Sequence, residues 1–236
     1  MALCKSIDLS DLPAERVWGE IEKLLMQSEL PSVGLTWLRD LGVIEKSFPE
    51  ISCLISVPQD PVWHPEGDVF VHTQLVIDQA HELITDLEYP QQVTVMLAAL
   101  AHDFGKPSTT EYLEGHWRSR GHEEAGVAPT TSFLDRLNVH SIDGYDVRGR
   151  VIALVREHLK PGEFYRSGMK LAKERFDVWH AGASLICYRV AKADSLGRNA
   201  PWVPRDQWYD ADAQEWFIHR ARELDVAQAP PNPISC

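Results

Sequence analysis

The strongly apolar segment Gln91–Phe104 constrains the fold most. It reads QQVTVMLAALAHDF, and Gly105 and Pro107 follow it, as is typical where a helix ends. A helix with so little polar surface is expected to be buried. It nevertheless finishes with an imidazole and a carboxylate, His102 and Asp103. Taken alone, this pair is either a satisfied histidine beside an exposed aspartate or part of a metal site.

Apolar residues recur at helical spacing along most of the chain, and almost no segment alternates as a strand does. Pro58, Pro61 and Pro65 make residues 57–67 a loop, and Pro161-Gly162 is expected to close a helix. Further helices are predicted at Ala14–Gln27, Val33–Leu41, Val69–Leu87, His122–Leu137, Val147–Leu159 and Phe176–Leu196. The sequence therefore predicts an all-α fold, a helical bundle with a short helical N-terminal appendage.

Charge and hydropathy exclude two classes of partner. The formal net charge of −12 argues against a broad basic surface for nucleic acid, so any phosphate-bearing ligand is expected to be met locally. No segment offers the roughly 18 apolar residues that a membrane span needs, and no apolar run follows a basic N-terminus. The cysteines stand singly, without a C-x-x-C pair, and are expected to be reduced. We therefore expect a cytoplasmic protein without a membrane partner.

Other potential metal ligands accompany the pair at the end of Gln91–Phe104. They share a position at or near a predicted helix end and are His72, His122, His158 and Asp194. Neighbouring helix residues point about 100° apart, but at a last turn both can lean around one ion. Nitrogen and carboxylate ligands without cysteine suit Mn²⁺, Fe²⁺, Ni²⁺, Co²⁺ or Zn²⁺, with Mg²⁺ also possible. The sequence thus predicts a divalent metal site built from separate helices.

These residues carry a resemblance to a known family. The order of His72, His102-Asp103 and Asp194 resembles that of the HD superfamily of metal-dependent phosphohydrolases. His122 and His158 look like the extra ligands of its two-metal members. The segments VPQDPVWHPEGDVFVHT, LAALAHDFGKP, GHEEAGV and KADSLGR are similar to the HD domain of bacterial CCA-adding tRNA nucleotidyltransferases. The upstream segment ERVWGEIEKLLMQSELPSVGLTWLRDLGVIEKSFPEI is similar to the helical neck that precedes that domain.

The resemblance covers Glu15 to Arg198 and implies a division of the chain. Residues 1–56 are expected to form a helical, neck-like N-terminal segment, residues 57–225 an HD phosphohydrolase domain, and residues 226–236 a flexible tail. The nucleotidyltransferase head of that family has no counterpart in the sequence. The chain is therefore expected not to add CCA.

The resemblance also implies an activity, which is hydrolysis of phosphomonoesters, 2′,3′-cyclic phosphates and 2′-nucleotides. We expect one ion to be held by His72, His102, Asp103 and Asp194. Asp103 would bridge to a second ion held by His122 and His158. Water bridging two divalent ions loses a proton more easily than bulk water and attacks phosphorus, while the ions neutralise the phosphate oxygens. The expected substrate is a small phosphorylated molecule, a nucleotide or an RNA end.

Three residues near this set have two interpretations each. Lys106 would contact a phosphate oxygen and take part in catalysis with Asp103, or it compensates a helix C-terminus. Arg198 contacts substrate or pairs with a carboxylate. His64 contacts substrate or hands a proton to the leaving group, or it stabilises its loop.

Two further features are weaker indications. Trp202 would line a nucleobase pocket, or it packs helices together. A basic cluster, which would steer an anion or form a solvated helix face, consists of Arg166, Lys170, Lys173 and Arg175.

Two other functions are compatible with the same residues. The chain would be a non-hydrolytic module that recognises tRNA or RNA 3′ ends, or a metal-stabilised ligand sensor. The intact ligand set favours hydrolysis over the recognition module, and only activity separates hydrolysis from the sensor.

Overall fold

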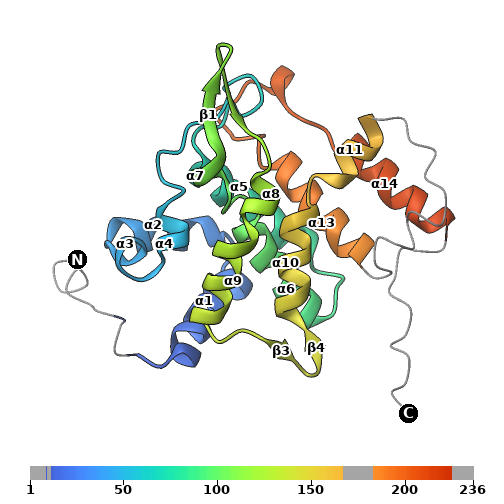
Figure 1. Cartoon of the computed structure of the whole chain (residues 1–236). Helices are drawn as coiled ribbons and strands as arrows, with labels where there is room; N and C mark the ends of the chain where they lie inside the picture. Colours follow the sequence, from blue (N-terminus) through green and yellow to red (C-terminus); the bar gives the residue numbers. More distant parts are fainter. Residues whose placement is uncertain (1–8, 10–11, 167–182, 225–236) are drawn as a thin grey trace.

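The computed structural model describes Leu9 and residues 12–166 and 183–224. It is mostly helical, as the sequence predicts (Figure 1). The helices α5 (Val69–Leu83), α6 (Tyr89–Ala101), α10 (Val147–Glu157) and α13 (Ala183–Leu196) pack against one another at its centre. Every residue of α6 from Val93 to Ala101 is buried. The prediction of a buried apolar helix is therefore confirmed.

The N-terminal helices pack on one side of this centre. They are α1 (Ala14–Gln27), α2 (Pro31–Asp40), α3 (Val43–Ser47) and α4 (Pro49–Ser52). Pro13 precedes α1, and its ring fixes a backbone angle that suits the start of a helix. Helix α1 buries Ile21 and Leu25 and contacts α6, while α2 contacts α5. The appendage is thus part of the same packed core.

Two short hairpins are absent from the sequence prediction. The first joins β1 (Thr110–Leu113) to β2 (His116–Ser119), and Glu114 and Gly115 between them both have positive φ. It follows α7 (Lys106–Thr109) and projects beyond the helices (Figure 1). The second joins β3 (Ser141–Ile142) to β4 (Tyr145–Asp146). Strands of two to four residues are too short for an alternating pattern to reveal them.

Several helix boundaries also differ from the prediction. The predicted helix His122–Leu137 is two helices, α8 (His122–Ala125) and α9 (Val127–Arg136), with Gly126 between them. Pro161 does not close the preceding structure but lies in the first turn of α11 (Lys160–Arg166), where a proline costs no hydrogen bond. The sequence did not predict α14 (Asp212–Glu223) or the 3₁₀ turn η2 (Arg205–Gln207). The predicted start of α13, at Phe176, lies outside the described residues.

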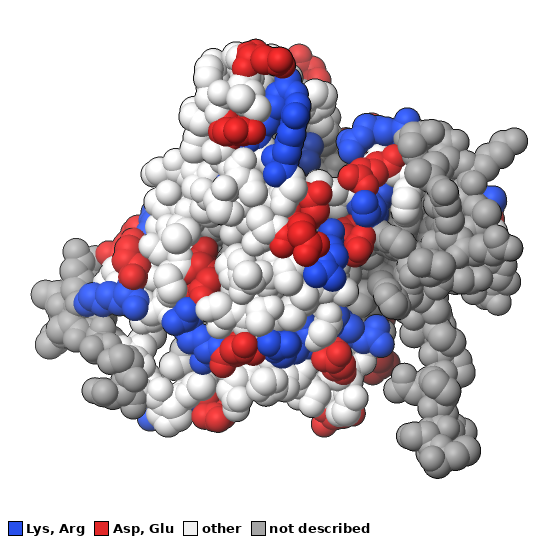
Figure 2. Space-filling model, in the orientation of Figure 1, with Lys and Arg blue, Asp and Glu red and all other residues white. Residues whose placement is uncertain are grey.

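The surface is of mixed charge. On the face in Figure 2, acidic and basic side chains are interspersed, without a broad field of one sign. Within the described ranges, no helix is both long and apolar enough to cross a membrane. Cys53 and Cys187 are free thiols, as expected, while Cys4 and Cys236 lie outside the described residues.

Candidate metal centre

Three histidines are held by the same local contact. The Nδ1–H of His102 donates to the carbonyl of Ala99 at 2.8 Å, three residues earlier. His122 and His158 make the same contact at 2.7 Å, to the carbonyls of Ser119 and Val155. A carbonyl only accepts, so a neutral ring held in this way carries its proton on Nδ1 and leaves the lone pair of Nε2 free. In its neutral form, each of these rings therefore offers Nε2 as a potential ligand atom.

His72, in the first turns of α5, is held by a carboxylate instead. Its Nδ1 lies 2.7 Å from Oε1 of Glu66, whose side chain is fully buried. Its Nε2 faces Oδ1 of Asp194 at 3.1 Å. Burial alone would lower the pKa of His72, but its bonds to Asp194 and Glu66 outweigh burial and raise that pKa. A metal ion at this nitrogen would therefore displace a proton.

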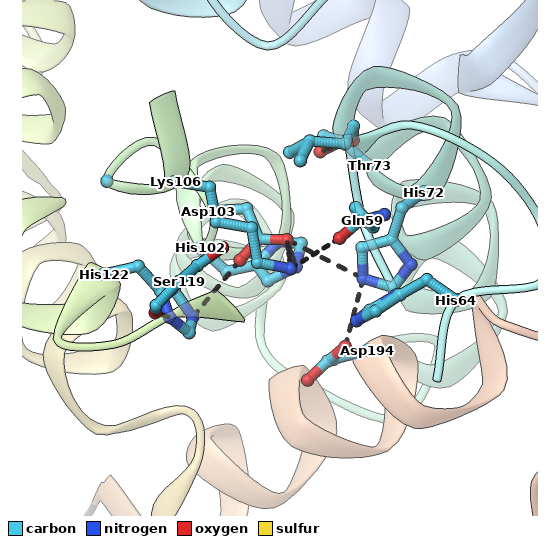
Figure 3. Close-up of polar contacts among 12 residues, drawn as sticks. Gln59, His64, His72, Thr73, His102, Asp103, Lys106, Ser119, His122 and Asp194 are labelled. Atoms are coloured by element: carbon cyan, nitrogen blue, oxygen red, sulfur yellow. Dashed lines mark hydrogen bonds and ion pairs between the residues drawn. The ribbon is translucent and has the colours of Figure 1, made fainter. Parts of the chain in front are cut away.

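Asp103 lies between the histidines. Its Oδ2 is 3.2 Å from Nε2 of His102, and its Oδ1 is 3.3 Å from Nε2 of His122. The longer distance from Oδ2 to Nε2 of His72 is 3.9 Å. Figure 3 shows Asp103, in the turn after α6, between His72 of α5 and His122 of α8, with Asp194 of α13 beside His72. The six residues that the sequence singled out thus come together in one place.

Burial sets the charge state of these groups. His158 is 2 % exposed, and burial, followed by the proximity of a second titratable ring in His122, lowers its pKa to about 3. Burial also lowers the pKa of His122. For Asp103 and Asp194 burial acts in the opposite direction, but neighbouring cationic groups outweigh it and hold both pKa values well below the ordinary range. The centre therefore presents neutral His122 and His158 beside ionised carboxylates.

Unsatisfied polar atoms test whether this donor set fits a divalent ion. Nε2 of His102 and both carboxylate oxygens of Asp103 are buried without a hydrogen bond of good geometry. Burying such atoms without well-formed hydrogen bonds is costly. Three groups of potential ligands have their ligand atoms within 4.8 Å of one another; one is His64, Glu66 and His72, and Asp103 belongs to the other two. These two are His72, His102 and Asp103, and Asp103, His122 and His158. These buried histidine and aspartate clusters are consistent with divalent metal binding.

Lys106 is the nearest cation to the centre. It is buried, and its Nζ lies 2.7 Å from both Oδ2 of Asp103 and Oε1 of Gln59. Arg198 lies 3.6 Å from Oδ1 of Asp194 and packs over the ring of Tyr209. Each of these cations therefore pairs with a carboxylate of the centre, which for Arg198 is one of its two interpretations.

A cavity of about 440 Å³ opens over these groups. Asp103, His122, His158 and Asp194 line it together with Lys106, Arg198 and His64. His64 donates from Nδ1 to Oε1 of Glu66 at 2.9 Å, and burial lowers its pKa to about 3. His72 and His102 are fully buried and do not line the cavity.

The structure reassigns some of the weaker indications. Trp202 does not line this cavity, because its indole N–H donates to the carbonyl of Glu66 at 3.1 Å. Arg166 lines the cavity, whereas Lys170, Lys173 and Arg175 lie outside the described residues.

Sequence reasoning missed several residues at the site. Glu66 is two residues from His64 in WHPEGD, and its acidic side chain within that motif was the available signal. Gln59 and Ser119 carry no signal in sequence, since only the fold brings them to the cavity. The same holds for Trp63 and Trp117.

Two family models match the chain. The first is described as "HD domain" and matches residues 69–197. The second is described as "Probable RNA and SrmB- binding site of polymerase A" and matches residues 2–54. The first match covers more than half of the chain and contains all six residues of the candidate centre.

The chain is similar to bacterial proteins named multifunctional CCA protein. The chain is 33% identical to that of Haemophilus influenzae over 228 residues, which is 96% of this chain and 53% of the relative. It is 41% identical to that of Pasteurella multocida over 204 residues, which is 83% of this chain and 46% of the relative. The chain therefore spans about half the length of the curated relatives that it matches.

Proposed function

Because the chain belongs to the HD domain family and is homologous to the C-terminal part of bacterial multifunctional CCA proteins, we propose that it is a metal-dependent phosphohydrolase. Its substrates are phosphoesters of nucleotides or RNA ends, namely 2′,3′-cyclic phosphates, 2′-nucleotides and phosphomonoesters. The observation that carries this proposal is the shared carboxylate of Asp103, which belongs to two of the three potential ligand groups.

The proposed ligands divide between two positions. One ion would be held by His72, His102, Asp103 and Asp194, and the second by Asp103, His122 and His158. Mn²⁺, Fe²⁺, Ni²⁺, Co²⁺ and Zn²⁺ all suit this donor set, and Mg²⁺ remains possible. Two divalent ions here would lower the pKa of water and neutralise phosphate oxygens.

The protein's own residues position the phosphate. Lys106 would bind a phosphate oxygen, because it already lines the cavity beside Asp103. Arg198 offers a second cation to the same cavity. His64 contacts the substrate through Nε2, since its Nδ1 is committed to Glu66.

A hydrolysis screen tests the proposal. The purified protein is treated with chelator, reloaded with Mn²⁺, Co²⁺ or Ni²⁺, and given cyclic nucleotides, 2′- and 3′-nucleotides, and simple mono- and diesters. Strained cyclic phosphates and nitrophenyl phosphates should react faster than unstrained alkyl diesters, because their leaving groups need less acid assistance. Metal-replete protein that leaves every ester intact would overturn the proposal.

A second function, recognition of RNA 3′ ends without hydrolysis, is favoured by one observation. Residues 2–54 match a family described as an RNA-binding site. Tight binding of an RNA end by metal-replete protein that hydrolyses none of the screened esters would support this alternative. Tight binding of a small phosphoester without turnover would support the ligand sensor instead.

A further inference from the structure

Two tryptophans on the wall of the cavity do not belong to the hydrophobic core that the described residues form. Trp63 lies in the loop before α5 and is 59 % exposed. Trp117 lies on β2 and is partly exposed. Both line the cavity that holds Asp103, His122 and His158. Large aromatic faces left open beside a polar site indicate a ligand with an apolar, flat part.

The loop and the hairpin that carry these tryptophans are joined directly. Nδ1 of His116, next to Trp117, lies 2.6 Å from Oδ2 of Asp60. The carbonyl of Asp60 accepts hydrogen bonds from the backbone N–H groups of Trp63 and His64 at 3.0 and 2.8 Å. Asp60 is 5 % exposed, while the side chain of His116 is 52 % exposed, so the contact is buried on the side of the loop and open on the side of the hairpin. It holds both indoles at one cavity although they come from separate segments.

The ring of Trp117 is also supported from its own hairpin. Tyr112 pairs with it across the two strands, and the ring centroids lie 5.0 Å apart in an edge-on arrangement. Such cross-strand aromatic pairs stabilise a hairpin. Trp117 is therefore held at the cavity wall by contacts that do not involve the core.

The same cavity wall carries the charges that would bind a phosphate. Lys106, Arg166 and Arg198 line it together with the potential metal ligands. A molecule that satisfies both parts of the wall needs an anionic phosphate and a flat aromatic group. A nucleobase attached to a phosphorylated ribose has both.

We propose that Trp63 and Trp117 bind the nucleobase of the substrate by stacking and thereby select base-bearing phosphoesters over base-free ones. This proposal rests on the proposed function for the phosphate-binding part of the cavity. Stacking tolerates every base, because each has an aromatic face, so the selection is for the presence of a base and not for its identity.

Binding without turnover tests the proposal independently of hydrolysis. The ligands are a 2′-AMP analogue with a methylene in place of the bridging oxygen and the matching base-free ribose phosphonate. Calorimetry on metal-loaded protein compares the unmodified chain with Trp63→Leu and Trp117→Leu. Each variant should bind the adenosine analogue about 5- to 100-fold more weakly, as is typical for loss of one aromatic stacking partner. Binding of the base-free analogue should not change.

Trp37 provides a matched control. It lies on α2, is 51 % exposed and does not line the cavity, so Trp37→Leu should bind both analogues like the unmodified protein. Thermal unfolding of all three variants checks that they fold. Equal losses for the base-bearing and base-free analogues, or no loss in either cavity variant, would overturn the proposal.

Two further arms separate the remaining possibilities. A trinucleotide that ends in the same phosphonate should bind more tightly than the mononucleotide if the natural ligand is an RNA end, and equally if it is a free nucleotide. The affinity of the trinucleotide thus identifies the type of ligand and does not test stacking. Stacking is supported only if Trp63→Leu and Trp117→Leu weaken binding. If those variants lose affinity but the protein hydrolyses no ester, the base-binding proposal is supported and the proposed hydrolase function is contradicted.

Discussion

The Nε2 atoms of His122 and His158 lie 3.3 Å apart, and in the neutral rings neither has a proton to share. Each ring donates its Nδ1–H to a backbone carbonyl, so two lone pairs face one another in a buried site. Burial lowers the pKa of both rings, which prevents a proton from filling the gap near neutral pH. A divalent cation is the group that this arrangement would stabilise.

The first prediction concerns the second ion. His158→Ala or His122→Ala should lose one of two bound ions. The other ion should stay bound, because neither histidine belongs to the ligands proposed for it. Loss of a residue that only hydrogen-bonds to a metal ligand typically costs roughly 10- to 100-fold in activity. Loss of a ligand itself should reduce activity by more than this. Elemental analysis and hydrolysis assays measure both effects.

Asp103→Ala should be worse than either histidine variant, since it removes the shared carboxylate. His219→Ala is the matched control, because His219 is exposed on α14 and does not line the cavity. A single ion in the unmodified protein, unchanged in both histidine variants, contradicts the two-ion arrangement.

The second prediction concerns Lys106. Lys106→Ala should keep its metal content while kcat/KM falls about ten- to hundred-fold, which corresponds to about 1.5–3 kcal/mol for a charge-assisted bond. Lys192→Ala serves as the control, because Lys192 pairs with Glu215 and does not line the cavity. Loss of metal with unchanged turnover per bound ion would instead assign Lys106 a purely structural role.

The third prediction concerns Gly105, at the end of the His102-Asp103 turn. A Cβ at this position would collide with the backbone carbonyl of His122 and lie 2.6 Å from the backbone nitrogen of Gly126. Backbone atoms cannot move aside as a flexible side chain can. Gly105→Ala should therefore reduce the free energy of unfolding by about 1–3 kcal/mol and displace His122.

Urea unfolding and metal titration of Gly105→Ala measure these two effects. The control is Gly19→Ala, since Gly19 lies within α1 and nothing would contact its Cβ. That variant should gain up to about 1 kcal/mol, because alanine favours helices over glycine. Equal stability of the two variants would refute the close approach at Gly105.

The fourth prediction concerns pH and metal-free protein. Burial lowers the pKa of His64 from 6.5 to about 3 in the folded protein. Between these values the unfolded chain binds a proton on His64 and the folded chain does not, so stability is lost as pH falls. His64→Gln should therefore show a shallower loss of stability from pH 6.5 to pH 4 than the unmodified protein. Urea unfolding in the presence of chelator measures the free energy of unfolding of both proteins at each pH. If the two free energies fall in parallel with pH, the prediction is wrong.

Local sequence patterns determined the central fold and the donor set. The apolar residues of Gln91–Phe104 could only be stable when buried, and Gly105 with Pro107 marked where that helix ends. The contact that frees Nε2 is also local, because His102 bonds to a carbonyl three residues earlier. Interactions of this range are visible in sequence, since helix geometry fixes the relation of residues three or four apart.

Only the tertiary structure brought the donors together. His72 and Asp194 are 122 residues apart in sequence, and their contact depends on how α5 packs against α13. Likewise, Asp60 meets His116 across 56 residues, which places Trp63 and Trp117 at one cavity while Trp202 lies away from it. Packing of side chains across helices decides these contacts, and no periodicity within one segment encodes that packing.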